Sequence, residues 1–180
     1  MSNIRIKQAI ALALYYGFAR FLPQSCSKIF GKPSKWIRYQ LARRIFLKCG
    51  KNVNIERMAD FGNGSRIEIG DNSGIGIRAR IPNNTIIGND VMMGPDCLIL
   101  DRNHSFERTD IPIRQQGFTS KEKIQTVIGN DVWIGTDVTM TPGRTIADGT
   151  VIGACCLLCK DFPAYSVVGG NPAKLIRSRK

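Results

Sequence analysis

The feature that most constrains this chain is a repeat of six residues that begins at residue 49. The first place of each repeat unit is a large apolar residue, the second is often Gly, and the fifth is small or β-branched. The series slips by two residues after the unit at 61–66 and is interrupted only at 105–127. A period of six fits neither a helix nor a plain strand, whose side-chain periods are about 3.6 and 2.

This spacing predicts short strands joined by tight corners, stacked as coils at about 4.8 Å. The large residue fills the centre of each coil, and the fifth must be small because the interior is narrow. Gly at place two, with Asn and Asp at places three and four, suits corners that visit positive φ. Arg144 occupies a fifth place, so it either reaches out of the coil or distorts it. The fifth places otherwise hold Val53, Ala59, Ser65, Ser73, Ala79, Thr85, Val91, Cys97, Val132, Val138, Thr150 and Cys156.

Residues 1–48 differ in character and form a separate basic and apolar helical segment. The chain has a net charge of +12, and residues 1–55 carry eleven Lys or Arg and no Asp or Glu. Apolar residues recur every four positions over 4–22, and Pro23 ends the predicted helix. A second helix is expected after Pro33. Two interpretations remain open: the helices pack on the main body, or they lie on an anionic membrane surface.

The apolar run in residues 8–19 follows basic residues, as in a signal peptide, but no small-residue cleavage site follows it cleanly. The run is also too short to span a bilayer as a helix. It predicts an uncleaved N-terminal helix in a cytoplasmic protein, with peripheral contact at the inner face of the membrane as the open alternative.

Metal and nucleic-acid functions are not supported by the side chains present. The six cysteines are irregularly spaced, and the Cys156-x-x-Cys159 pair lies far in sequence from the only histidine. A structural zinc needs four ligands, so we expect no metal site and no disulfide framework. Positive charge alone, with no basic motif or stacking array, does not predict nucleic-acid binding.

The stretch "VIGNDVWIGTDVTMTPGRTIADGTVIGACCLLCKDFPAYSVVGGNPAKLIRSRK" resembles the hexapeptide-repeat acyltransferases, and the resemblance covers residues 49–180. The chain is most similar to the sugar O-acetyltransferases of the maltose and galactoside type and to capsule polysaccharide acetyltransferases. The resemblance implies an all-β fold: a left-handed parallel β-helix that forms homotrimers with active sites between subunits. It also implies acetyl-CoA as co-substrate. We expect the turn at Asn171-Pro172 to lead into a short C-terminal helix.

The single histidine, His104 in "ILDRNHSFERTD", is the last residue before the repeat breaks. A long loop on a rigid scaffold is usually functional. The resemblance implies that His104 deprotonates the acceptor hydroxyl, as a neutral imidazole can near neutral pH. The other ring nitrogen then needs an acceptor, and Asp101, Glu107 and backbone carbonyls remain candidates.

Other site residues follow from the resemblance. Trp133 matches the Trp of "VWIG", the backbones of Thr136 and Ala154 match the pantetheine channel, and the Thr136 N–H matches a thioester or oxyanion donor. Lys160, with Lys174 and Arg177, could reach the phosphates of CoA. The cofactor set is Trp133, Thr136, Ala154, Cys159, Lys160, Lys174 and Arg177. The acceptor candidates are Asn83, Asn84, Asp101 and Asn103.

The stretch "GIGIRARIPNN" lacks the acidic residue with which relatives bind sugar, so the acceptor is not inherited from the resemblance. The leading hypothesis is a CoA-dependent O-acetyltransferase acting on a sugar or surface-polysaccharide precursor. Its rivals are a xenobiotic or serine-type O-acetyltransferase on the same scaffold, and a non-catalytic β-helix scaffold. A β-helix carbonic anhydrase would need several histidine ligands for zinc, and this chain has one histidine.

Overall fold

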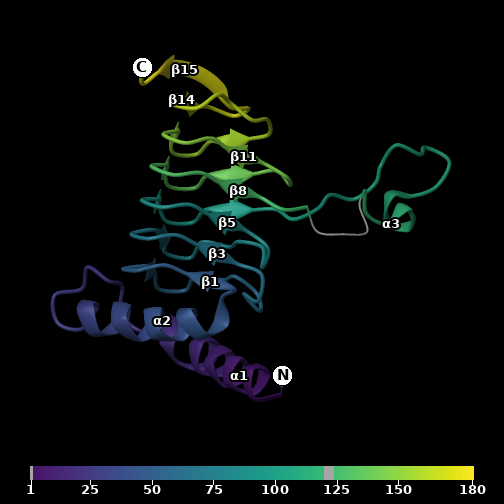
Figure 1. Ribbon diagram of the computed structural model, residues 1–180. Helices are drawn as coiled ribbons and strands as arrows, with labels where there is room; N and C mark the ends of the chain where they lie inside the picture. The colour runs from purple at the N-terminus through teal and green to yellow at the C-terminus, as the bar shows by residue number, and fades with distance from the viewer. Residues whose placement is uncertain (1, 120–123) are drawn as a thin grey trace.

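Short parallel strands stack into a three-sided β-helix in the computed structural model, which describes residues 2–119 and 124–180 (Figure 1). The chain passes through the three faces in turn, and strands on the same face pair with those of the neighbouring coils; on the third face the first two coils contribute only isolated bridges at Asp60 and Arg80. The first face holds β1 (Lys48–Cys49), β3 (Glu68–Ile69), β5 (Ile86–Ile87), β8 (Val127–Ile128) and β11 (Thr145–Ile146). The second holds β2 (Asn54–Ile55), β4 (Gly74–Ile75), β6 (Met92–Met93), β9 (Trp133–Ile134), β12 (Val151–Ile152), β14 (Ser166–Gly169) and β15 (Lys174–Ser178). The third holds β7 (Leu98–Ile99), β10 (Thr139–Met140) and β13 (Leu157–Leu158).

The core is the inside of the stack, filled from the first and fifth places of the repeat as predicted. Ile55, Ile75 and Ile134 are fully buried at first places. One assignment was wrong: Ser65 is only partly buried, and Ile67 takes the inward place before β3. The corner before β3 holds the two extra residues at which the repeat slips. The inward-facing place therefore moves from residue 65 to residue 67.

The corners use glycine differently from the prediction. Positive φ occurs at place four, as at Asn52 (φ 53°) and Asp137 (φ 56°), and Asn and Asp tolerate this region. Glycine at place two is required by close stacking instead. A Cβ on Gly135 would lie 2.6 Å from the amide nitrogen of Ala154 in the next coil. Residues larger than Gly would therefore push neighbouring coils apart.

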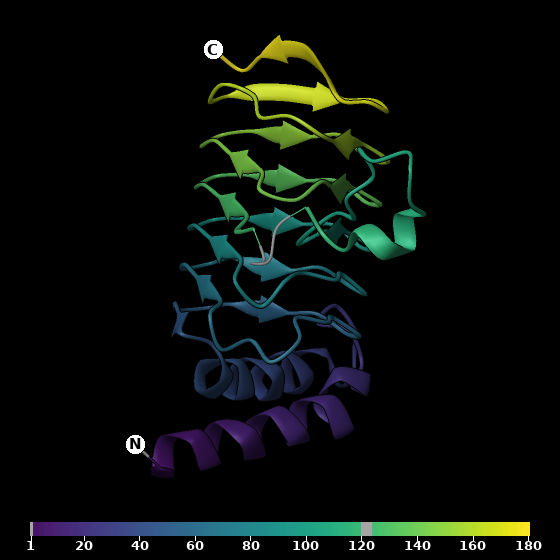
Figure 2. The ribbon, with the colours of Figure 1, turned by 90° about the vertical axis from the view of Figure 1, so that its right-hand side faces the viewer.

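Helices close the N-terminal end of the stack in two layers (Figure 2). They are α1 (Ser2–Gly17), the 3₁₀ turn η1 (Ala19–Phe21) and α2 (Gly31–Ile45). The first helix is shorter than predicted, and the second begins two residues before Pro33, which the first turn tolerates. Tyr15 is fully buried, and its hydroxyl donates to the carbonyl of Ala59 (3.0 Å). Within the described residues, no helix is long and apolar enough to cross a membrane.

A buried ion pair joins α2 to the first coil. The fully buried Arg38 donates from Nη1 to the carbonyls of Leu22 (3.2 Å) and Pro23 (3.0 Å), and it pairs with Glu56 at 3.6 Å. Burial favours the neutral form of the Glu56 carboxyl. Hydrogen bonds from the hydroxyl and N–H of Ser25 outweigh that effect and lower the Glu56 pKa below its ordinary value. The ion pair therefore fixes the helical layer on the coils.

The predicted C-terminal helix is wrong. The chain returns as strand β15, which pairs antiparallel with β14, and the Arg179 N–H donates to the Tyr165 carbonyl (2.7 Å). The outer edge of β14 would otherwise present unpaired backbone groups. Pairing with the returning chain covers this edge.

Candidate active site

An arm leaves the β-helix at the corner between the third and first faces, after β7. Figure 1 shows it projecting sideways from the stack, with helix α3 (Ile113–Gln116) near its tip. The chain rejoins the stack at β8, so the arm corresponds to the predicted loop at 105–127. Residues 120–123 of that loop lie outside the described residues.

His104 lies on a short antiparallel ribbon within the arm. The Ser105 N–H donates to the carbonyl of Gly117 (3.1 Å), and the Thr119 N–H donates to the carbonyl of Asn103 (2.9 Å). The exposed imidazole stacks on Phe118, with ring centroids 4.6 Å apart. The guanidinium of Arg102 lies 4.2 Å from the centroid of the same ring. Phe118 thereby fixes the plane of the imidazole.

The carbonyl oxygen of Gly117 lies 3.2 Å from Nδ1 of His104. A carbonyl only accepts, so Nδ1 carries the proton and Nε2 keeps a lone pair. Of the three kinds of candidate partner, the structure brings a backbone carbonyl to the ring. The Glu107 carboxylate accepts from the Phe106 N–H (3.1 Å), and the Asp101 carboxylate lies 3.8 Å from Nε of Arg102. Sequence reasoning missed Gly117 and Phe118 because they lie beyond the repeat.

Several predicted cofactor residues do gather along one edge, the corner between the second and third faces. Thr136 and Ala154 are exposed there in successive coils, and the Cys155 N–H donates to the Thr136 carbonyl (2.8 Å).

Trp133 is 53% exposed and lies on the adjacent second face. In the strand register, Trp133 pairs with Val151, Val151 pairs with Val167, and Val167 pairs with Arg177, so these four residues form one column across the second face. Lys174 opens the same strand as Arg177.

Cys159 and Lys160 lie at the opposite edge of the third face, above the base of the arm. The Lys160 ammonium is 5.4 Å from the centroid of the Phe162 ring. Arg144 also reaches this corner: its Nη1 donates to the carbonyl of Cys159 (3.0 Å) and pairs with Asp161 at 3.3 Å. Arg144 therefore leaves the interior, and β11 keeps its register with β8. The predicted cofactor residues thus divide between two corners of one chain.

The acceptor candidates divide as well. Asn83 and Asp101 line a hollow of about 680 Å³ at the base of the arm, together with Asp60, Asn63 and Arg80. The amide of Asn83 donates to Oδ1 of Asn63 (2.7 Å). Asn84 is 6% exposed, so its side chain does not offer an acceptor contact. Asn103 is exposed on the arm, next to His104.

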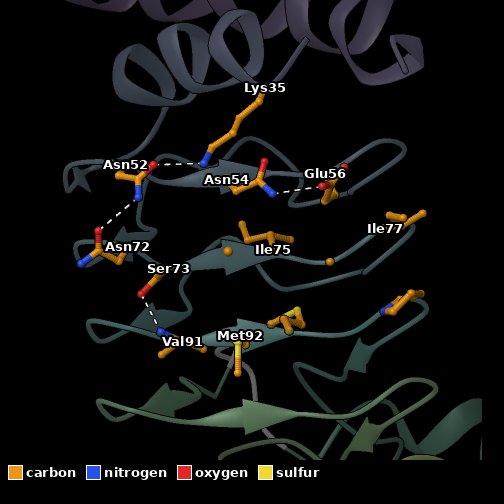
Figure 3. A pocket seen from close by; sticks show the side chains of 14 residues that line it. Lys35, Asn52, Asn54, Glu56, Asn72, Ser73, Ile75, Ile77, Val91 and Met92 are labelled. Atoms are coloured by element: carbon orange, nitrogen blue, oxygen red, sulfur yellow. Dashed lines mark hydrogen bonds between the residues drawn. The ribbon is translucent and has the colours of Figure 1, made fainter. Parts of the chain in front are cut away.

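A different hollow, of about 340 Å³, opens on the second face under α2 (Figure 3). The Lys35 ammonium donates to Oδ1 of Asn52 (3.0 Å), and Nδ2 of Asn52 donates to Oδ1 of Asn72 (3.2 Å). Asn54 donates to Oε1 of Glu56 (3.0 Å). None of the predicted site residues is among the described residues that line it. We interpret its polar groups as a ladder that ties successive coils to α2.

The cysteines do not form a second site. All six are described, and all are free thiols. Burial raises the pKa of the Cys97 thiol to about 11 and raises that of Cys156, so both stay protonated near neutral pH. No cluster of three or more His, Cys, Asp or Glu suited to a metal occurs within residues 2–119 and 124–180.

The parallel β-helix of six-residue repeats places the chain in a class, the hexapeptide-repeat transferases. Residues 125–160 match the family described as "Bacterial transferase hexapeptide (six repeats)". The chain is 32% identical to galactoside O-acetyltransferase of Escherichia coli K12 over 142 residues, which cover 78% of this chain and 68% of that protein. It belongs to the hexapeptide-repeat acetyltransferase family.

Two further similarities extend the comparison. Over 54 residues, 30% of this chain, it is 59% identical to a chloramphenicol acetyltransferase of Agrobacterium fabrum, and the match spans only 26% of that relative. A hexapeptide-repeat acetyltransferase of Vibrio cholerae O1 biovar eltor, solved with acetyl coenzyme A, superposes with a TM-score of 0.71 at 26% identity. That similarity covers 99% of this chain and 88% of the other.

Proposed function

We propose that this protein is an acetyl-CoA-dependent O-acetyltransferase that acts on a hydroxyl of a sugar or surface-polysaccharide precursor. The observation that carries the proposal is the geometry of His104. Its Nδ1 is committed to the Gly117 carbonyl, so Nε2 is left as a base on an arm beside a polar hollow. The family relationship supplies the reaction class, and the sugar relative favours a carbohydrate acceptor.

In this mechanism His104 accepts the acceptor's hydroxyl proton at Nε2 while the oxygen attacks the thioester carbonyl carbon. The new C–O bond forms, the C–S bond breaks, and the imidazolium returns its proton to the departing thiolate. The Thr136 N–H would donate to the oxygen that becomes negative in the transition state. Acetyl-CoA supplies an activated acyl group, so the residues need only orient the reactants, move one proton and stabilise one charge.

We further propose that the active site forms between copies of the chain in a homotrimer. His104 leaves the third face at one corner, while Thr136 and Ala154 lie at the other corner. A site built by one arm and the corner of a neighbour would bring the two sets together. Native mass spectrometry should give a trimer.

Mixing subunits tests this shared site directly. His104→Ala and Ala154→Trp should each be inactive alone, whereas random mixed trimers should regain activity at about a quarter of the sites. Mixtures that stay inactive while exchanging subunits would contradict a shared site.

The reaction itself is tested by following CoA release from acetyl-CoA with a panel of sugars, serine and chloramphenicol. We expect turnover with sugars and little with the other two. Preferential acetylation of chloramphenicol would support the xenobiotic alternative, which the chloramphenicol acetyltransferase relative motivates. Absence of CoA release with every acceptor would favour a non-catalytic scaffold.

The N-terminal helices support a finer proposal, peripheral contact of a cytoplasmic protein with an anionic membrane. Ile6, Ile10, Leu14 and Phe18 form a stripe on α1 and the residue after it, and each is 51% to 56% exposed. An apolar hollow between α1 and α2 is flanked by the cations Lys7 and Arg44. An apolar stripe bordered by Lys and Arg suits the interface of an anionic bilayer.

Vesicle sedimentation tests this contact. The full chain should sediment with phosphatidylglycerol vesicles, but not with phosphatidylcholine vesicles. The double substitution Ile10→Ser and Leu14→Ser should abolish the effect. Ile113→Ser on the arm, which removes an apolar side chain of similar exposure, serves as control. If the wild type stays in the supernatant with both vesicles, the stripe does not bind membranes.

A further inference from the structure

Arg80 lies on the third face at the point where the arm begins. Its backbone bridges Asp60 in the coil below and Leu98 in the coil above. The Ile99 N–H donates to its carbonyl (2.9 Å), so Arg80 is tied directly to the strand from which the arm departs. The side chain is exposed and points away from the core, because the neighbouring Ala79 and Ile81 are buried.

The hollow at the base of the arm contains two carboxylates, and each already has its own partners. Asp60 accepts from the Tyr16 hydroxyl (3.1 Å) and lies 3.9 Å from the Arg20 guanidinium. Asp101 lies 3.8 Å from the guanidinium of Arg102. Arg80 lines this hollow and makes no side-chain hydrogen bond or ion pair within the described part of the chain.

Arg80 also lines a second hollow, of about 480 Å³, on the other side of its side chain. There Arg78 holds Asp96 through two hydrogen bonds, the first 2.6 Å long from Nε to Oδ1. Asp137 stands beyond this pair, one coil further up, and its charge adds to the attraction on Arg78. Of the arginines that line this hollow, Arg20 pairs with Asp60 and Arg78 pairs with Asp96, whereas Arg80 has no ion pair within the described residues, so its guanidinium is open to a ligand.

We propose that the acceptor carries an anionic group, a phosphate or a carboxylate, that Arg80 binds while the hydroxyl to be acetylated reaches His104. This inference rests on the proposed function, because it names the substrate class of the same site. A guanidinium presents its N–H groups as a planar fork that matches either anion. The amides of Asn63 and Asn83, in the same hollow, suit neutral hydroxyls of the sugar.

Direct binding tests the inference separately from catalysis. The probes are glucose, glucose 1-phosphate and glucuronate, titrated by calorimetry into the full chain with CoA at saturation, so that the phosphate sites of CoA are filled. We expect at least one of the two anions to bind about tenfold more tightly than glucose. Arg80→Gln should lower the affinity for that anion to the affinity for glucose. Arg80→Lys should retain part of the preference for the anion.

Arg43→Gln is the matched control, because it removes an equal charge from the exposed face of α2. Preference for glucose 1-phosphate alone identifies a phosphate acceptor, and preference for glucuronate alone identifies a carboxylate. Equal affinity for glucose and both anions overturns the inference, as does an equal loss in Arg43→Gln. If anions bind through Arg80 but no acetyl-CoA is consumed, the proposed function fails and the anion site stands.

Discussion

Nδ1 of His104 lies 3.2 Å from the carbonyl oxygen of Gly117, across a ribbon formed by the arm itself. The two residues are separated by the stretch that contains α3, so the arm must fold back before the imidazole is oriented. Because the partner is a backbone atom, no neighbouring carboxylate is needed to set the tautomer.

The first prediction concerns the base. His104→Ala should lower kcat by about 10²–10⁴-fold, because general-base catalysis contributes in that range. The KM for acetyl-CoA should change little, because the imidazole contacts the reacting proton and not the cofactor. Steady-state kinetics measure both constants. Arg114→Ala, an exposed change on α3 of the same arm, is the control, and an equal loss in it would point to disruption of the arm instead.

The second prediction concerns CoA. Arg177 shares the Trp133 column on the second face, so Arg177→Gln should raise the KM for acetyl-CoA by about threefold to tenfold. The kcat should be nearly unchanged, because a phosphate contact made equally in ground and transition states affects binding alone. The control is again Arg43→Gln. A fall in kcat at constant KM would remove Arg177 from the phosphate site.

The third prediction concerns stacking of the coils. A Cβ on Gly76 would overlap the carbonyl of Gly94 in the next coil. Gly76→Ala should therefore lower the free energy of unfolding by about 1–3 kcal/mol, as overpacking does. Gly17→Ala has open space around it and should be neutral or slightly stabilising. Urea unfolding compares the two, and equal stabilities would show that the coils can separate without cost.

The fourth prediction concerns acid stability. The Glu56 pKa is lowered in the folded chain, so its contribution is present above the unfolded value of about 4.3 and is lost as pH falls through the folded pKa. Glu56→Gln should lower stability at pH 7 by about 1–3 kcal/mol, because its donors lose a charged acceptor. It should also flatten the pH dependence below pH 5.

Glu68→Gln provides the comparison for Glu56, since Glu68 forms a largely exposed pair with Lys48 at 2.6 Å. Such pairs contribute about 1 kcal/mol or less. Thermal unfolding between pH 3 and pH 7 measures both variants. If Glu56→Gln kept the acid sensitivity of the wild type, the buried pair would not be its source.

Among the residues assigned from sequence, those inside the repeat were located best. Large first-place residues such as Ile75 and Ile134 are buried as expected, since each hexad repeats one local geometry. The C-terminal strand was missed because β15 is selected by the open edge of β14, a contact that exists only after the stack forms. The inward place before β3 was assigned to Ser65 and not to Ile67 because the slip in the repeat does not reveal which residues of the corner are the two extra ones.

The sequence by itself determined the stacked-coil architecture and the position of His104 at the one break in the repeat. Both follow from local periodicity, which is written in consecutive residues. The tertiary structure decided which atom orients the imidazole, how the cofactor residues divide between two corners, and that Arg80 lines two hollows without a side-chain partner among the described residues. These relations join residues from different coils or from opposite sides of the arm, and they exist only once the chain has folded back on itself.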